Sequence, residues 1–110
     1  MEIRFVYMTM SDLQEARKIG RALLEKRLVA CVNMFNGMQS MYWWDGAIEE
    51  DQEVVLIAKT IREKIPELKR TVTSLHSYDC PCIVALPVTE GNQPFFDWIE
   101  ETVNPISKMS

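Results

Sequence analysis

Four runs of the chain have the composition of β-strands. Residues 3–9, 29–35, 53–59 and 82–88 are rich in β-branched, aromatic and other apolar side chains, which strands favour. The third run follows an acidic stretch at residues 49–53. We expect a β-strand in each run.

Apolar residues recur at helical spacing in the segments that follow the first and third strand runs. The first helix is predicted to end near Arg27, and Ser11 with Gln14 has the spacing of a capping box at its start. The second helix is predicted to begin near Arg62. Pro66 then lies in the first turn, where its missing N–H costs no helical hydrogen bond.

A third helix is predicted after the last strand. Asn92 is a suitable N-cap, and the spacing puts four apolar side chains on the inner face: Phe95, Trp98, Ile99 and Val103. The order is therefore βαββαβ followed by a helix.

This order predicts an α+β fold, the ferredoxin-like sandwich of four antiparallel strands with two helices on one face. The 110 residues form a single domain, 1–110, long enough to bury a modest core. The second face of the sheet needs a cover, which is either the third helix or a second subunit.

A long hairpin joins the second and third strands. Asp45-Gly46 is a turn dipeptide that tolerates positive φ, which predicts a two-residue turn with Trp44 opposite Ala47. Gly37 lies within the incoming strand and predicts a bend or bulge there. Both arms are then longer than an average strand.

The tip of this hairpin is aromatic. Trp43 and Trp44 are adjacent and must point to opposite faces of the strand. A small domain cannot easily bury both, so we predict that Tyr42, Trp43 and Trp44 form a subunit interface.

Composition excludes several classes of protein. The net charge of −4 and the lack of an aromatic-basic strand signature argue against an RNA-binding or other nucleic-acid-binding module. No apolar run is long enough to span a membrane, and no signal peptide is visible. Three cysteines in a chain that needs no bridges predict reduced thiols and a cytoplasmic protein.

Candidate chemistry is sparse. His76 is the only histidine, and it serves either as a charged residue at a helix end or as a ligand. Cys80 and Cys82 flank one proline and suit a soft ion such as Cu(I), unless one of them packs in the core. Cys31, inside a strand, is interpreted as a small buried hydrophobe. No sequence motif for catalysis is present, so we expect no enzyme activity.

The acidic stretch at residues 49–53 lacks the spacing of a calcium loop. It is interpreted as a solvated strand face that discourages edge pairing, with collection of hard cations as the alternative.

Several separate motifs resemble the CutA family, small proteins named for divalent cation tolerance. The motifs occur in the family's order and spacing over roughly residues 3–103: Ala30-Cys31-Val32-Asn33, Tyr42-Trp43-Trp44-Asp45-Gly46, Lys59-Thr60, His76-Ser77-Tyr78, Ala85-Leu86-Pro87-Val88, Gly91-Asn92 and Asp97-Trp98-Ile99.

This resemblance implies a homotrimer of PII-like architecture, in which long hairpins extend sheets across subunit boundaries. It also implies a role in tolerance or homeostasis of copper and other divalent metals. Some bacterial relatives have a cysteine near the end of the first strand that is considered a copper ligand together with a histidine at the end of the second helix. The matching positions here are Met8 and His76, while Leu75 replaces an adjacent second histidine.

The function expected is therefore a non-enzymatic homotrimer in metal tolerance that binds Cu or Zn weakly near subunit clefts. The candidate metal ligands are His76, Met8, Cys80 and Cys82. The alternative is a PII-like signalling or scaffold trimer that binds a small anion or a partner protein between subunits.

Overall fold

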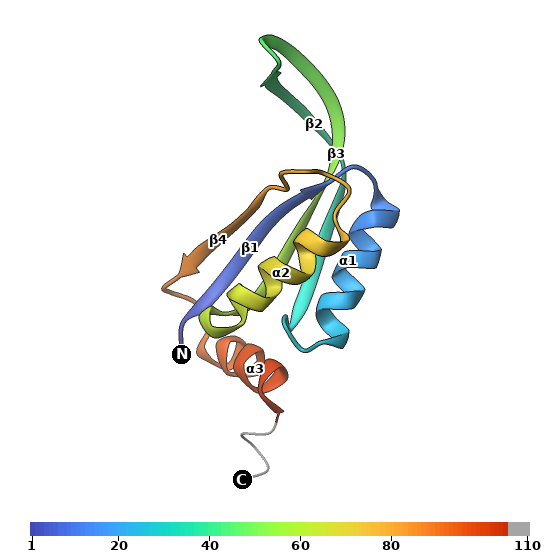
Figure 1. Cartoon of the computed structure of the whole chain (residues 1–110). Coiled ribbons are helices and arrows are strands. Elements are labelled where there is room, and N and C mark those ends of the chain that lie inside the picture. Colours follow the sequence, from blue (N-terminus) through green and yellow to red (C-terminus); the bar gives the residue numbers. More distant parts are fainter. Residues whose placement is uncertain (106–110) are drawn as a thin grey trace.

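The computed structural model describes residues 1–105 and contains the predicted elements in the predicted order (Figure 1). Their bounds are β1 (Ile3–Met10), α1 (Leu13–Glu25), β2 (Cys31–Trp44), β3 (Ala47–Ile61), the 3₁₀ helix η1 (Arg62–Lys64), α2 (Ile65–Leu75), β4 (Ile83–Val88) and α3 (Gln93–Val103).

The strands form one antiparallel sheet in the order β2-β3-β1-β4. Helices α1 and α2 lie side by side on one face of this sheet (Figure 1). The ferredoxin-like α+β sandwich predicted from the element order is therefore confirmed.

The main core lies between the sheet and these two helices. Alternate residues of the central strands point toward the helices because side chains alternate across a strand. Its fully buried members within helices and strands come from four elements: Val6, Met8 and Met10 of β1, Val54, Leu56 and Ala58 of β3, Ala16, Ile19 and Leu23 of α1, and Leu68 and Val72 of α2.

The opposite face of the sheet is covered only at one end. There α3 buries Ile99 and Val103 against Ile3 and Ile61, and Figure 1 shows α3 at the end of the sheet that lies away from the hairpin. Further along this face the side chains of Phe35, Val84 and Leu86 are exposed. A single subunit therefore leaves an apolar sheet face open.

The hairpin of β2 and β3 has the predicted register. Trp44 pairs with Ala47, and the turn residues Asp45 and Gly46 have φ values of 50° and 79°, as the two-residue turn requires. The predicted irregularity at Gly37, with φ of 80°, is also confirmed by a shift of register between Phe35 and Met38.

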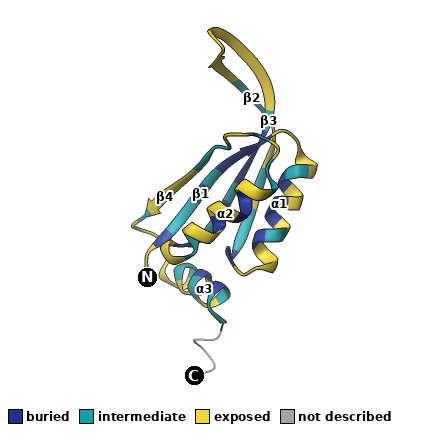
Figure 2. Ribbon diagram, in the orientation of Figure 1, coloured by how far each residue is buried: buried dark blue, intermediate teal, exposed yellow. Residues whose placement is uncertain are grey.

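The outer part of the hairpin projects beyond the helices and curves toward the side of the sheet that carries β4 (Figure 1). Figure 2 shows this part as almost wholly exposed. Trp43 and Trp44 are 73% and 63% exposed. β3 is longer than the predicted strand at residues 53–59, because the acidic stretch before it is also part of the strand.

For the first helix, the predicted N-cap is wrong, whereas the predicted end near Arg27 is confirmed. The N-cap is Asp12 and not Ser11: its side chain accepts a hydrogen bond from the backbone N–H of Glu15 at 2.8 Å. The helix ends at Glu25, because Arg27 adopts a left-handed conformation with φ of 58°.

The inner face of the third helix is also smaller than predicted. Ile99 and Val103 are buried, but Trp98 is 43% exposed. Its ring stacks on Phe95 with a centroid distance of 5.8 Å. Asn92 is the N-cap by position, although its side chain makes no capping hydrogen bond.

Candidate functional site

A groove of about 740 Å³ lies where the outer hairpin faces the segment between α2 and β4. Its lining comes from β1, the hairpin and residues 78–82: Thr9, Tyr42, Trp43, Trp44, Glu49, Asp51, Glu53, Tyr78, Asp79, Cys80 and Cys82. The lining thus combines aromatic rings, carboxylates and two thiols, with no lysine, arginine or histidine.

Two phenol hydroxyls donate hydrogen bonds to carboxylates in this groove. Tyr42 donates to Oδ2 of Asp51, and Tyr78 donates to Oε2 of Glu53 at 2.9 Å. The hydrogen bond to Asp51 raises the pKa of Tyr42 to about 12. Burial, followed by the hydrogen bond to Glu53, raises the pKa of Tyr78. Both phenols therefore act as neutral donors.

His76 lies just behind the groove, at the end of α2, with a fully buried side chain. Its Nε2 is 2.7 Å from the backbone oxygen of Thr9, and its Nδ1 accepts the backbone N–H of Tyr78 at 3.0 Å. Because a carbonyl only accepts and an amide N–H only donates, these bonds select the neutral ring with the proton on Nε2. A metal would have to displace one of them.

Glu15 holds the segment that carries His76 and Tyr78. Its Oε2 accepts the backbone N–H of Ser77 at 2.7 Å, and its Oε1 accepts the N–H and hydroxyl of Ser11, both at 3.1 Å. Burial acts to raise the pKa of Glu15, but the hydrogen bonds from Ser77 and Ser11 together hold it below its usual value.

The sequence prediction did not include Glu15. Asp12 and Glu15 have the same capping-box spacing as Ser11 and Gln14, so the spacing alone contained a signal for this residue. Nothing in the sequence indicated that Ser77, 62 positions away, donates a hydrogen bond to Glu15.

The structure separates the four predicted metal ligands into two groups. Met8 is buried in the main core, and His76 is bonded to backbone groups. Cys80 and Cys82 both line the groove, Cys80 exposed and Cys82 half-buried. Within residues 1–105, no three histidine, cysteine or acidic side chains are grouped so as to hold a metal ion.

The environments of the two half-buried thiols, Cys82 and Cys31, also differ. Burial raises the pKa of Cys82, the nearby Glu53 raises it further, and a hydrogen bond with Thr9 acts in the opposite direction. Cys31 starts β2 outside the groove, and burial raises its pKa against the effect of Lys59. Cys31 thus lies apart from the site, although it is half-buried and not fully buried as predicted.

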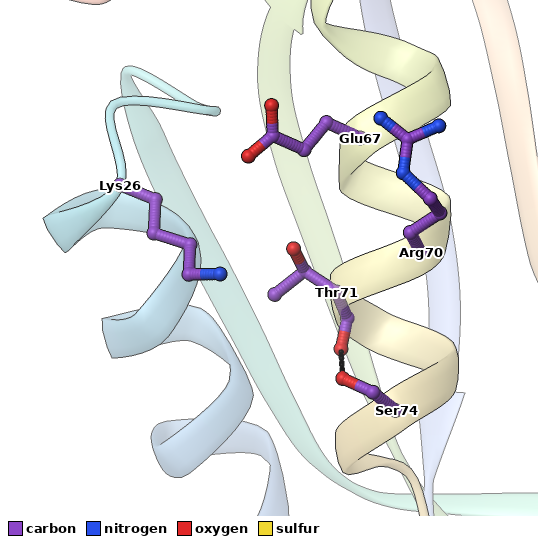
Figure 3. Close-up of a pocket in the computed structure, with 5 residues that line it drawn as sticks. All are labelled: Lys26, Glu67, Arg70, Thr71 and Ser74. Carbon is purple, nitrogen blue, oxygen red and sulfur yellow. Dashed lines mark hydrogen bonds between the residues drawn. The ribbon is translucent and has the colours of Figure 1, made fainter.

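A second hollow, of about 400 Å³, lies between α1 and α2 (Figure 3). It is lined by Lys26, Glu67, Arg70, Thr71 and Ser74. The Lys26 ammonium points toward Thr71, whereas the Arg70 guanidinium points away from it. The two cations do not converge on one point, and none of the predicted site residues lies here.

The fold defines a class: α+β proteins of ferredoxin-like, PII-like architecture, whose long central hairpin in this chain lines an acidic and aromatic groove. Residues 4–102 match the model of one such family, described as the CutA1 divalent ion tolerance protein. The chain belongs to the CutA1 family, which is named for tolerance and not for a catalytic activity.

Relatives and solved structures agree with this assignment. The divalent-cation tolerance protein CutA of Archaeoglobus fulgidus is 48% identical over 99 residues, which cover 90% of this chain and 96% of that protein. Its solved structure, described as periplasmic, matches with a TM-score of 0.89 over 92% of this chain and 98% of that one, at 46% identity.

Two further relatives come from a bacterium and from human. The Thermus thermophilus protein of the same name is 47% identical over 96 residues, covering 87% of this chain and 93% of that protein. Human protein CutA is 40% identical over 101 residues, which cover 92% of this chain and 56% of the human protein. No helix described between residues 1 and 105 is long and apolar enough to cross a membrane.

Proposed function

We propose that the chain acts as a non-enzymatic homotrimer in the tolerance of divalent cations, copper among them. In this proposal it binds Cu or Zn weakly in clefts between subunits. The observation that carries the proposal is the lining of the groove: four carboxylates and two thiols with no cationic side chain. Such a lining attracts cations and repels anions.

Assembly is supported by the apolar surface that one subunit leaves open. Phe35, Val84 and Leu86 are exposed on the sheet face opposite α1 and α2, and Trp43 and Trp44 are exposed on the hairpin. Exposed apolar surface of this extent is typical of a protein interface. A second and third copy of the chain would cover the sheet face and give the hairpin a partner.

Metal binding is assigned to the two thiols of the groove. Cys80 and Cys82 line one hollow and offer soft sulfur ligands. Two protein ligands are fewer than the four of a structural zinc site, which is consistent with weak binding. Met8 and His76 would join this site only after a rearrangement that opens the core or breaks the bond between His76 and Thr9.

The test is a titration of the metal-free protein with Cu(I), Cu(II) and Zn(II). We expect the Cys80→Ser/Cys82→Ser variant to bind Cu(I) at least about tenfold more weakly, and His76→Ala to change the affinity little. Cys31→Ser is the matched control, because it removes a thiol outside the groove. Unchanged affinity in every variant would show that the ligands are wrongly assigned.

The proposal places the protein in the cytoplasm, where its three free cysteines stay reduced. The PII-like alternative, a trimer that binds a small anion, gains no support from the acidic groove of the single subunit. A thermal-shift screen separates the two, since a ligand that binds only the native state raises the melting temperature. A small anion that stabilises the trimer more than Cu or Zn would favour the alternative.

A further inference from the structure

Two of the three cysteines lie two positions apart in a short connection of the fold. Cys80-Pro81-Cys82 precedes β4 and belongs to neither a helix nor a strand. Both thiols line the same hollow, Cys80 exposed and Cys82 half-buried. Cys31 starts β2 and lies outside that hollow. The chain therefore has one pair of neighbouring thiols and one separate thiol.

The spacing of Cys80 and Cys82 meets the distance requirement of a disulfide. Two Cα atoms that are two positions apart are separated by at most about 7 Å, and disulfides join Cα atoms less than about 7 Å apart. The side chains must also lie on the same side of the chain, and both line one hollow. A disulfide between them therefore requires only a local adjustment of the backbone.

Contacts on either side hold this connection in place. On one side, Ser77 donates its backbone N–H to Glu15 at 2.7 Å. On the other side, Ile83 pairs with Met8 of β1. The residues between these two points belong to no regular element, so ring closure there leaves the helices and strands unchanged.

The two thiols differ in their surroundings. Cys80 is exposed, so a small reagent reaches it first. Cys82 is half-buried, and burial and the nearby Glu53 raise its pKa. Because the thiolate is the reactive form, Cys82 reacts slowly with an external reagent but can attack a sulfur held next to it. This difference assigns the first step of an exchange reaction to Cys80 and the second step to Cys82.

We propose that Cys80 and Cys82 form a reversible dithiol–disulfide pair whose oxidant is a low-molecular-weight disulfide of the glutathione type. In the first step the Cys80 thiol loses its proton to solvent, and its Sγ attacks one sulfur of the small disulfide, which releases one small thiolate. In the second step the deprotonated Sγ of Cys82 attacks the Cys80 sulfur and releases the second small thiolate. Both released thiolates take up protons. Two protein thiols are thus oxidised to one disulfide, and the small disulfide is reduced to two thiols.

The inference goes beyond the metal-tolerance proposal and needs no metal. Disulfides in cytosolic proteins are typically transient or redox-sensing, so the pair rests as thiols and closes only when its surroundings become oxidising. The ring lies within one subunit, and neither cysteine is among the aromatic residues assigned to assembly. Because the thiolate is the form of cysteine that binds metals, the disulfide and the proposed Cu(I) site exclude each other.

The experiment is a titration of the metal-free, full-chain protein with mixtures of reduced and oxidised glutathione. Acid quenching, alkylation of the remaining thiols and peptide mass spectrometry identify the paired cysteines, and light scattering follows the assembly. We expect a Cys80–Cys82 disulfide that forms within each subunit as the share of oxidised glutathione rises. The disulfide should open again when reduced glutathione is restored, and Cys31 should remain a free thiol throughout.

Single variants test the order of the two steps. Cys82→Ser removes the second thiol, so we expect glutathione to accumulate as a mixed disulfide on Cys80. Cys80→Ser should take up several-fold less glutathione, because the thiol that remains in the hollow is half-buried. Cys31→Ser is the matched control, and it should oxidise at the same glutathione ratio as the wild type.

Two results would overturn the inference. One is the absence of a Cys80–Cys82 disulfide at the highest share of oxidised glutathione. The other is a disulfide that joins two subunits or includes Cys31. Both results concern the sulfur atoms in the absence of metal, so they are distinct from a failure of the Cu(I) titration.

Discussion

The inner and outer parts of β3 belong to one continuous strand, yet they are stabilised by different surroundings. In the inner part, Val54, Leu56 and Ala58 are buried beneath α1 and α2. In the outer part, residues 47–52 are all exposed. β2 pairs with both parts, whereas β1 pairs only with the inner part, so the two parts differ in what surrounds the strand.

This contrast separates two kinds of stability. The inner part derives its stability from apolar burial within the subunit. An isolated two-stranded ribbon is marginally stable in water, and the outer part has only its turn, its backbone pairing and the bond between Tyr42 and Asp51. We therefore expect changes in the inner part to affect folding, and changes in the outer part to affect assembly.

The largest effect on folding is predicted for Leu56→Ala. Leu56 is fully buried in the main core, and its truncation leaves a cavity. We expect a loss of about 3–5 kcal/mol in the free energy of unfolding. Urea denaturation at a fixed protein concentration measures this loss.

Ile48→Ala is the comparison in the outer part of the same strand. Ile48 is exposed on the hairpin, so its truncation should cost less than about 1 kcal/mol. Equal losses in the two variants would mean that the hairpin is part of the folding core.

A smaller effect on folding, but a clear effect on assembly, is predicted for Trp44→Ala. Trp44 is exposed in the subunit, so the secondary structure should persist while the proposed trimer dissociates at lower dilution than that of the wild type. Light scattering over a dilution series measures this. Trp98→Ala serves as the control, because Trp98 is exposed on α3 away from the hairpin.

A Trp44→Ala protein that stays fully trimeric, with an unchanged melting temperature, would contradict the proposed role of the hairpin in assembly. A Trp43→Ala protein extends the test to the other face of the strand. Loss of assembly in only one of the two variants would show which face meets the neighbouring subunit.

The fold and the hairpin could be predicted because they depend on residues close together in the sequence. Asp45 and Gly46 tolerate positive φ, and their position between two strand-like runs determines the register of the hairpin. The exposure of Trp98 was harder to predict, because helical spacing describes a stripe but not its width. Only Ile99 and Val103 of that stripe are fully buried.

The site was less predictable because its contacts join distant parts of the chain. The sequence marks His76 as unusual, but the carbonyl of Thr9 that occupies its Nε2 is 67 positions away. The groove likewise depends on the curve of the hairpin toward the segment that holds Cys80. Cysteine spacing indicated Cys80 and Cys82, whereas the hydrogen bond from Ser77 to Glu15 became evident only in the structure.

An effect on folding weaker than that of Leu56→Ala is predicted for Glu15, which joins α1 to the rim of the groove. Glu15→Gln removes the negative charge that accepts hydrogen bonds from Ser77 and Ser11. We expect a loss of about 1–3 kcal/mol in the free energy of unfolding at neutral pH. Glu25→Gln is the control, because Glu25 lies at the other end of α1 in an exposed pair with Arg21.

The pH dependence distinguishes this role from simple packing. The pKa of Glu15 is lower in the folded protein than in the unfolded chain, so folding favours the ionised form. Its contribution is complete above the unfolded pKa, about 4.3, and is lost as the pH falls through the folded pKa. The difference between wild type and Glu15→Gln should therefore shrink below about pH 4. A difference that stays constant from pH 7 to pH 3 would mean that Glu15 acts through its shape and not through its charge.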